Sequence, residues 1–270
     1  DFPEILEVSQ IYSVVWKLNK DQPLITQRPF RQVHHTASKV SIIGGGTHLT
    51  PGEISLAHKG ILFFDELTEF PREVLEVLRQ PLEDSVIHIS RVSGTVEYPA
   101  NVMFIASMNP CKCDYYKDPE KSCSCSLSEI KRYQSKISGP LLDRIDMILE
   151  IPREKIDTLL TKSLNQSSAE LRQQVIKAWK IQKDRFWKSG IQTNAMMEAK
   201  DIDHYIQLDS ACKDFLSQAA ERFTLSGRVI HRLLKLGRTI ADMEGKDQLE
   251  VGHLMEAIHY RSKTMFVENE

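Results

Sequence analysis

Two adjacent acids follow a short apolar run in the first third of the chain. The sequence GILFFDE, residues 60–66, predicts a strand buried on both faces of a parallel sheet, because continuous apolar runs are typical of such strands. A carboxylate at the end of this strand, Asp65, can bind Mg²⁺, which prefers oxygen ligands. The next carboxylate, Glu66, can polarise an attacking water, so the pair suits phosphoryl transfer. The alternative is a strand that ends in two solvated acids.

A second apolar run, residues 102–106, also ends in polar residues. Asn109 follows it, and an amide beside the acidic pair could orient the attacking water. The alternative is an asparagine that forms a turn before Pro110, which is a common use of Asn-Pro.

Two arginines have side chains that suit phosphate recognition. Arg144 follows a turn and a short predicted helix, and its planar guanidinium matches phosphate geometry and stays protonated. Spacing alone favours the alternative for Arg144, an ion pair with Asp143 or Asp146. Arg228 lies in the first turn of a predicted helix capped by Ser226, where a cation opposes the helix dipole. That position gives some support to a ligand-facing role, but without further context the alternative, a solvated arginine, is favoured.

Four of the five cysteines lie within fifteen residues, as two C-x-C pairs: Cys111, Cys113, Cys123 and Cys125. Four thiolates can form a tetrahedral zinc site, although the pairs are tighter than the common C-x₂-C spacing. Free thiols and disulfides are the alternatives. The odd number of cysteines and the lack of a visible secretory signal favour a reducing, cytoplasmic setting.

The elements that must position these residues form an α/β part to about residue 153 and an all-α part from 154 to 270. Each element follows from its hydrophobic period and its bounding turn residues. The α/β part is predicted to contain a helix at 3–18, a polar irregular stretch to about 50 with a mobile glycine loop tip at 44–46, a short helix at 51–57, a helix at 71–80, a hairpin of strands 86–89 and 95–98, a helix from Ser126 or Ser128 to 137, and strands at 61–64, 102–106 and 147–151. The all-α part is predicted to contain helices at 168–188, 209–222, 226–243 and 250–262.

Bulk composition restricts the class of protein. The 270 residues are 41% hydrophobic and 27% charged, which is an ordinary globular balance. No apolar run reaches eighteen residues, so no membrane-spanning helix is expected. The net charge of −2 gives no general support for nucleic-acid binding, so a DNA-binding surface would have to be local. The chain starts at Asp1 without a methionine, and we expect it to be a fragment.

Several long stretches resemble the magnesium-chelatase-like AAA+ proteins of bacteria, and within them most closely the competence-associated ComM/YifB-type group. The stretches are RPFRQVHHTAS at 28–38, GGGTHLTPGEISLAHKGILFFDEL at 44–67, RYQSKISGPLLDRID at 132–146 and LSGRVIHRLLKLGRTIADMEG at 225–245. The resemblance implies a fold, a partial AAA+ P-loop NTPase core with a parallel sheet followed by a helical lid domain.

The resemblance also implies roles for the polar residues. Asp65 and Glu66 would be the Walker B pair, with Asp65 on Mg²⁺ and nucleotide and Glu66 catalytic. Asn109 would be sensor 1, Arg144 an arginine finger that acts on a neighbouring subunit, and Arg228 the sensor 2 arginine of the lid.

Two further segments acquire roles in the same way. Residues 31–50 would be the helix-2 insertion of this clade, and 86–98 a hairpin before sensor 1; by analogy with ring motors, Lys39, His48 and Arg91 become candidate DNA contacts.

The activity implied is that of a hexameric, cytoplasmic, ATP- and Mg²⁺-dependent motor. It would act on single-stranded or branched DNA, as a helicase or branch-migration enzyme in natural transformation. The phosphate-binding pattern GxxxxGK[ST] is missing from these residues, since no lysine follows Gly44–Thr47 in the right place, so the chain alone is expected to be inactive. The alternatives are a non-enzymatic interaction module stabilised by zinc and an ATPase subunit of a magnesium chelatase.

Overall fold

The computed structural model describes residues 2–18, 21, 23–91, 94–151 and 166–261. The chain divides into two compact units, the first extending to Ile145 and the second beginning at Asp146. The predicted domain boundary at residue 153 lies outside the described residues. In the part of the chain that is described, no helix is long and apolar enough to cross a membrane.

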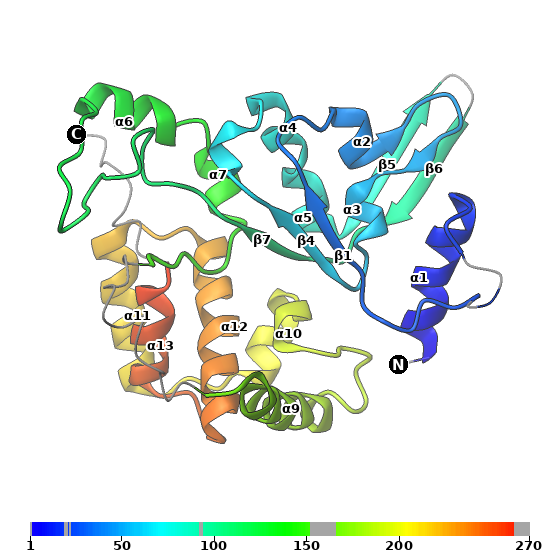
Figure 1. Ribbon diagram of the computed structural model, residues 1–270. Helices are drawn as coiled ribbons and strands as arrows, with labels where there is room; N and C mark the ends of the chain where they lie inside the picture. Colours follow the sequence, from blue (N-terminus) through cyan, green and yellow to red (C-terminus); the bar gives the residue numbers. More distant parts are fainter. Residues whose placement is uncertain (1, 19–20, 22, 92–93, 152–165, 262–270) are drawn as a thin grey trace. The chain divides into compact units, whose positions relative to one another are not determined.

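A parallel three-stranded sheet forms the centre of the first unit (Figure 1). Its strands are β1 (Phe30–Val33), β4 (Ile61–Phe64) and β7 (Met103–Ala106), in the order β1-β4-β7. The central strand β4 is the predicted ILFF strand, and its Leu62 and Phe64 side chains are completely buried. The parallel sheet expected from the sequence is therefore confirmed.

Strand β1 lies in a stretch that was expected to be irregular, and the proposed insertion at 31–50 overlaps it. Its sequence FRQV mixes apolar and polar residues, so it lacks the continuous apolar pattern of β4. The fold forms this strand through backbone pairing with β4, in which Arg31 lies opposite Leu62.

The strand predicted at 102–106 is present as β7, but the prediction that it is buried is wrong. β7 pairs with β4 on one side only, and the side chains of Met103 and Ile105 are 62% and 40% exposed. Apolar residues fit the pleated backbone of an edge strand whether or not both of its faces are covered. An apolar run therefore predicts the strand but not its burial.

The first unit contains the predicted helices, with different bounds, together with a helix at 39–43 and a 3₁₀ turn at 67–69 that were not predicted. They are α1 (Phe2–Val14), α2 (Lys39–Ile43), α3 (Glu53–Leu56), α4 (Arg72–Val77), α5 (Arg79–Asp84), α6 (Leu127–Gln134), α7 (Gly139–Leu142) and the 3₁₀ turn η1 (Leu67–Glu69). Two helices replace the single one predicted at 71–80, because Pro81 has no N–H to donate to the carbonyl of Val77 and is accommodated only in the first turn of a new helix.

Of the three glycines at 44–46, only Gly46 lies in an exposed turn, and Gly44 and Gly45 do not form the mobile loop tip that the sequence predicted. Gly44 and Gly45 are buried as strand β2 (Gly44–Gly45), which pairs antiparallel with β3 (Thr50–Pro51). Gly44 has a φ of +101°, and a Cβ there would lie 2.4 Å from the carbonyl oxygen of Thr50. Glycine is needed at this position for close backbone packing.

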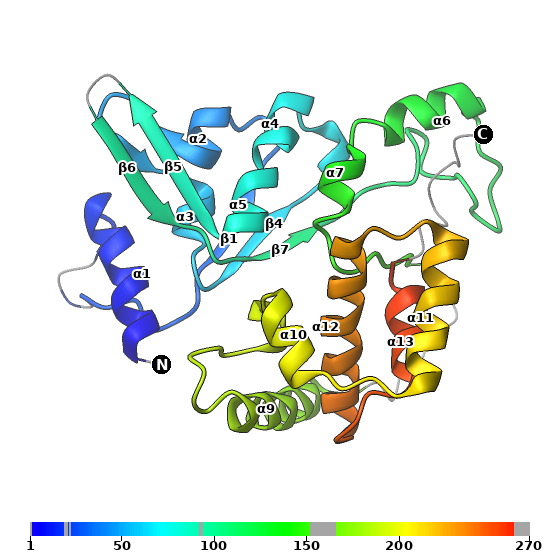
Figure 2. The ribbon, with the colours of Figure 1, turned by 180° about the vertical axis from the view of Figure 1, so that it is seen from behind.

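The predicted hairpin is confirmed as β5 (Val86–Arg91) and β6 (Gly94–Pro99), paired antiparallel. Its predicted tip residues, 92 and 93, lie outside the described residues. The Tyr98 hydroxyl donates to the carbonyl of Leu49, 2.8 Å away, so the hairpin is joined to the β2–β3 turn. The hairpin and α6 lie at opposite ends of the first unit (Figures 1 and 2).

The predicted strand at 147–151 is not present. Residues 147–151 have no strand pairing, and Ile151 is 88% exposed. The Ile148 amide donates instead to the carbonyl of Tyr260, at 2.6 Å. The apolar run MILEI has strand composition, but no neighbouring strand is available to satisfy its backbone groups.

All regular elements in the described part of the second unit are helical, as predicted. They are α9 (Ser168–Arg185), η2 (Asn194–Met196), α10 (Ala199–Tyr205), α11 (Ser210–Phe223), α12 (Gly227–Glu244) and α13 (Val251–His259). The short helix α10 was not predicted. Helices α11, α12 and α13 lie side by side (Figure 2). The main hydrophobic core of the second unit consists of Phe186, Met197, Ile202, Ile206, Cys212, Leu216, Leu234, Leu249 and Leu254.

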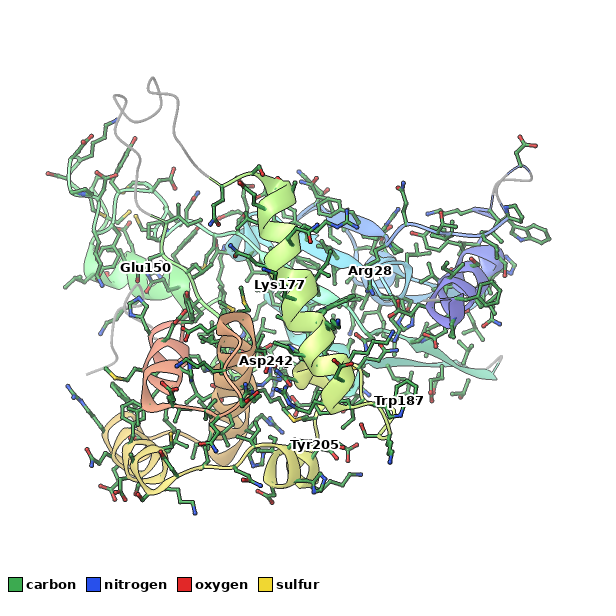
Figure 3. The ribbon with its side chains drawn as sticks, turned by 90° about the horizontal axis from the view of Figure 1, so that it is seen from below. Arg28, Glu150, Lys177, Trp187, Tyr205 and Asp242 are labelled. Atoms are coloured by element: carbon green, nitrogen blue, oxygen red, sulfur yellow. The ribbon has the colours of Figure 1, made fainter. Side chains whose placement is uncertain are left out.

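A buried carboxylate joins α9 and α12 in this unit. The side chain of Asp242, which is labelled in Figure 3, is not exposed, and it pairs with both Arg185 and Arg238. Asn194 also donates to Asp242 Oδ2, at 2.7 Å. Because a buried charge is tolerated only when it is paired and hydrogen-bonded, this network fixes the helices relative to each other.

Candidate functional site

The three parallel strands end in register, and a polar residue follows each of them. Val33, Phe64 and Ala106 are paired across the sheet. The next residues, His34, Asp65 and Ser107, therefore start three adjacent loops at the same edge. In open α/β sheets, ligands bind outside the carboxyl ends of the strands, so this edge is the candidate functional site.

Ser107, which follows β7, connects that strand end to the carboxylate pair that follows β4. Its hydroxyl donates to Asp65 Oδ1 and accepts the Glu66 amide, at 3.2 Å. The backbone repeats the connection, because the Leu67 amide donates to the Ser107 carbonyl at 2.8 Å. Glu66 itself has left-handed backbone angles, with φ of 52° and ψ of 53°. This uncommon conformation for a non-glycine residue turns the chain sharply at the end of β4.

His35 approaches the acidic pair from the loop after β1. Its Nδ1 lies 3.5 Å from Glu66 Oε2. The sequence did not predict this contact. Recognition of β1 as the third strand would have placed the His34-His35 pair beside Asp65, since parallel strands align their carboxyl ends.

Asn109 lies exposed two residues beyond Ser107. Within the described residues, no hydrogen bond joins its amide to Asp65 or Glu66. Ser107, and not Asn109, is the residue after β7 whose side chain bonds the Asp65 carboxylate and the Glu66 backbone amide. The sequence missed Ser107 because a serine after a strand is common and carries no charge that would mark it.

The donor set at this edge suits a hard cation. Asp65 and Glu66 are exposed carboxylates, and both hydrogen bonds to Asp65 use Oδ1, so Oδ2 takes part in neither. Mg²⁺ is typically bound by one or two carboxylates together with waters and phosphates. The residues present therefore fit a site for Mg²⁺ with a phosphate ligand.

Arg144 is largely buried and paired within the first unit. Its Nε lies 3.2 Å from Glu83 Oε2, and its Nη1 donates to the carbonyl of Pro140 at 2.7 Å. Arg144 forms an ion pair with Glu83 near the end of α5, an acid that the sequence spacing did not suggest. Of the two acids that spacing suggested, Asp146 pairs with Arg232 in the second unit.

Arg228 belongs to the second unit and is exposed in the first turn of α12. Ser226 caps this helix as predicted, because its hydroxyl accepts the Val229 amide at 3.4 Å. Arg228 thus lies at the positive end of a long helix, where an anionic ligand is favoured.

The candidate DNA contacts belong to neighbouring segments of the first unit. Lys39 is the exposed first residue of α2, and His48 is exposed in the β2–β3 turn. Arg91 is the last residue of β5, and its side chain lies outside the described part. The Tyr98–Leu49 hydrogen bond joins the hairpin to the residue that follows His48.

The four clustered cysteines are brought together by the loop between β7 and α6. Cys111 Sγ lies 3.4 Å from Cys113 Sγ and 3.7 Å from Cys123 Sγ, and 3.5 Å separates Cys113 from Cys123. All four sulfur atoms, including that of Cys125, lie within 4.8 Å of one another. These separations exclude disulfides, whose S–S bond is about 2.05 Å, and they suit four ligands of one metal ion.

The thiols of the cluster differ in acidity. Hydrogen bonding to the backbone at Tyr115 lowers the pKa of the Cys113 thiol to about 5. Burial and the adjacent thiols raise the pKa of Cys125. One thiolate is therefore favoured at neutral pH, and a bound metal ion would have to displace the remaining protons, as thiolate ligation generally requires.

Two family models match the chain in succession. The model described as magnesium chelatase, subunit ChlI, matches residues 1–159, and its C-terminal counterpart matches residues 165–261. The first match includes the carboxylate pair, Ser107 and the cysteine cluster. The second includes the helical unit with Arg228.

Individual relatives agree with the family match. The chain is 41% identical to the competence protein ComM of Haemophilus influenzae over 90% of this chain and 47% of that protein. It is 41% identical to YifB of Salmonella typhimurium over 96% of this chain and 50% of that protein. A more distant relative, the maternal DNA replication licensing factor mcm6 of Xenopus tropicalis, is 20% identical over 79% of this chain and 26% of its own length. The chain thus spans about half the length of ComM and YifB.

Proposed function

The chain belongs to the family of the magnesium chelatase subunit ChlI, and from this premise we propose that it is part of an ATP-hydrolysing AAA+ motor that acts on DNA. The observation that carries the proposal is the convergence of Asp65, Glu66 and Ser107 at the carboxyl edge of the parallel sheet. Such an edge, with two exposed acids, suits the binding of a nucleotide phosphate through Mg²⁺.

We assign a different role in ATP hydrolysis to each polar residue at the sheet edge. Asp65 would hold the Mg²⁺, and when bound this ion neutralises charge on the phosphates. Glu66 accepts a proton from the attacking water and orients it. Ser107 fixes both acids through its hydroxyl, and His35 restrains the Glu66 carboxylate. Asn109 is proposed as sensor 1, which contacts the water or phosphate once nucleotide is present.

The two arginines are proposed to stabilise charge on the transferred phosphoryl group. Arg144 would act on the nucleotide of a neighbouring subunit in a hexameric ring, exchanging its ion pair with Glu83 for a phosphate. Arg228, at the positive end of α12, would contact phosphate from the helical lid. Both roles use the bidentate, permanently charged guanidinium.

DNA is the proposed substrate of the motor. The relatives include a competence protein and a DNA replication licensing factor by name, which supports a helicase or branch-migration activity in natural transformation. Lys39, His48 and Arg91 are proposed to contact single-stranded or branched DNA. The hydrogen bond between Tyr98 and Leu49 would hold the hairpin and the β2–β3 turn as one surface.

Replacement of Glu66 tests the ATPase assignment. In the full-length protein, Glu66→Gln is expected to reduce ATP turnover by about 10²- to 10⁴-fold, because the amide cannot act as a general base. ATP affinity should remain close to that of the wild type, since Glu66 does not hold the phosphates. Phosphate release measures turnover and calorimetry measures affinity.

The matched control is Glu69→Gln, an exposed acid in η1 three residues further along. It should leave turnover unchanged. Wild-type turnover in the Glu66→Gln protein would reject the assignment.

A magnesium chelatase subunit is the second candidate, favoured by the description of the matching family. The motor chemistry would be the same, and only the target would differ. Stimulation of ATP turnover by single-stranded or branched DNA distinguishes the two, since a chelatase subunit has no reason to respond to DNA.

A further inference from the structure

The cysteine cluster forms a second candidate site, separate from the acidic edge of the sheet. With a Zn–S distance of about 2.3 Å, tetrahedral geometry places ligand sulfurs about 3.8 Å apart. Three of the six sulfur–sulfur separations, at 3.4–3.7 Å, are close to this value, and all four sulfurs lie within 4.8 Å of one another. A multi-iron cluster requires sulfurs that are further apart, so the spacing favours one ion held by four thiolates.

The loop that carries the cluster has almost no core of its own. Between Pro110 and Ser126 the structure has no helix or strand, and Cys111 is the one fully buried residue. Asp114 and Lys117 both have positive φ angles, a conformation that disfavours non-glycine residues. Ordering a loop of this length costs conformational entropy, which apolar burial does not offset here. A metal ion is a source of the missing stabilisation.

The two ends of the loop are connected to the acidic site. Asn109 precedes Cys111 by two residues, and Ser126, which follows Cys125 directly, caps α6 through a capping box. Helix α6 then returns to the sheet edge. The buried Gln134 amide donates to the carbonyl of Pro110 at 2.9 Å.

A second contact from the end of α6 reaches the other strand-end loop. Lys136 Nζ donates to the carbonyl of Thr68, at 2.7 Å. Thr68 lies two residues after Glu66 in the sequence. Thr68 is completely buried. The loop after β7 and the loop after β4 are thus both held by the segment that follows the cysteines.

We propose that Cys111, Cys113, Cys123 and Cys125 bind one structural Zn²⁺ ion, which orders the β7–α6 loop and, through Gln134 and Lys136, fixes the backbone at Asn109 and Glu66. The four thiolates are ligands, and Gln134 and Lys136 are positioning residues. The zinc ion does not contact nucleotide. This inference does not depend on ATP or DNA, because it concerns the order of the backbone.

The first measurement is the metal content of the full-length protein purified without chelators. Elemental analysis is expected to give about one zinc ion per chain, as for a closed four-ligand site. The Cys113→Ser/Cys125→Ser double variant should lose the zinc. Cys212→Ala is the control, because Cys212 lies in the core of the second unit, and it should retain zinc.

The second measurement is hydrogen exchange before and after zinc is removed from folded wild-type protein with a strong chelator. The amides of Ser107 and Leu67 are hydrogen-bonded where the two loops meet. Their exchange is expected to become at least about tenfold faster, because zinc no longer opposes local opening of the loops. Amides of the β5–β6 hairpin, at the opposite end of the unit, should not change. Zn²⁺, and not Mg²⁺, should restore protection.

Gln134→Ala separates metal binding from positioning. This variant should keep its zinc and yet show faster exchange at Ser107. Less than about 0.2 zinc per chain in the wild type, iron in place of zinc, or unchanged exchange at Ser107 and Leu67 after zinc removal would each overturn the proposal. Because none of these measurements uses nucleotide, they can fail while the ATPase assignment stands, and the reverse also holds.

Discussion

Ser107 is the side chain that links the Asp65 carboxylate to the backbone of Glu66. It contacts Asp65 through its hydroxyl and the Glu66 amide through the same oxygen. Residues that orient ligating carboxylates affect metal affinity and activity even though they do not bind the ion. Sequence reasoning selected Asn109 for the end of this strand, and the side chain that contacts the acids is two residues earlier.

Removal of the Ser107 hydroxyl is predicted to impair the motor. In the full-length protein, Ser107→Ala should lower Mg²⁺-dependent ATP turnover by about 10- to 100-fold, the usual effect of losing a residue that orients a metal ligand. A steady-state assay over a range of Mg²⁺ concentrations provides the measurement. Ser13→Ala, which removes an exposed hydroxyl bonded to the Gln10 carbonyl within α1, should have no effect. An unchanged Mg²⁺ dependence in Ser107→Ala would contradict the positioning role.

At the scale of elements, His58 joins three segments that support the sheet. It follows α3, its Nε2 contacts Glu7 of α1 at 3.1 Å, and its Nδ1 accepts the amide of Asn101 at 3.1 Å, just before β7. The Asn101 bond requires an unprotonated Nδ1, which fixes the neutral tautomer. Burial, the largest cause, lowers the pKa of His58 below its usual value.

The lowered pKa of His58 predicts that the protein loses stability on mild acidification. The folded state favours the neutral ring, so below a pH of about 6.5 the unfolded chain binds more protons at this position and unfolding becomes easier. The melting temperature of the wild type should be lower at about pH 5.5 than at about pH 7.5. His58→Gln, which is always neutral, should show a smaller fall.

Glu7 provides an internal check on this interpretation. The hydrogen bond to His58 lowers the pKa of Glu7, so its contribution to stability is present above the ordinary carboxyl range and is lost only at more acidic pH. Its contribution is therefore the same at both pH values and does not cause the change in melting temperature. An equal fall in melting temperature for the wild type and His58→Gln would show that other histidines cause the pH dependence.

At the scale of the whole molecule, the chain consists of an α/β unit and a helical unit, and it spans about half the length of ComM and YifB. Nucleotide binding in such motors needs a nest of backbone amides and a lysine on the phosphates. The GxxxxGK[ST] pattern that supplies both does not occur in these 270 residues.

The isolated 270-residue chain is therefore predicted to bind ATP too weakly to detect by calorimetry. The acidic edge alone offers Mg²⁺ ligands but no cradle for the phosphates. The full-length protein serves as the positive control in the same buffer with Mg²⁺. Micromolar affinity in the isolated chain would overturn this expectation.

The sequence by itself determined the elements whose signal is local. The apolar ILFF run predicted β4, alternation predicted the β5–β6 hairpin, and helical periodicity with serine caps predicted α6, α9 and α12. The acidic pair and the four cysteines were visible from residue type and spacing. These features depend on near neighbours in the chain, which is why pattern alone identifies them.

The tertiary structure decided which distant residues meet. The polar strand β1 forms because it pairs with β4, and only that register brings His35 to Glu66. The Glu83 partner of Arg144 depends on chain paths that no local pattern encodes. The same is true of the contacts from α6 to both strand-end loops. Local propensity selects an element, but the packing of elements far apart in sequence determines the site.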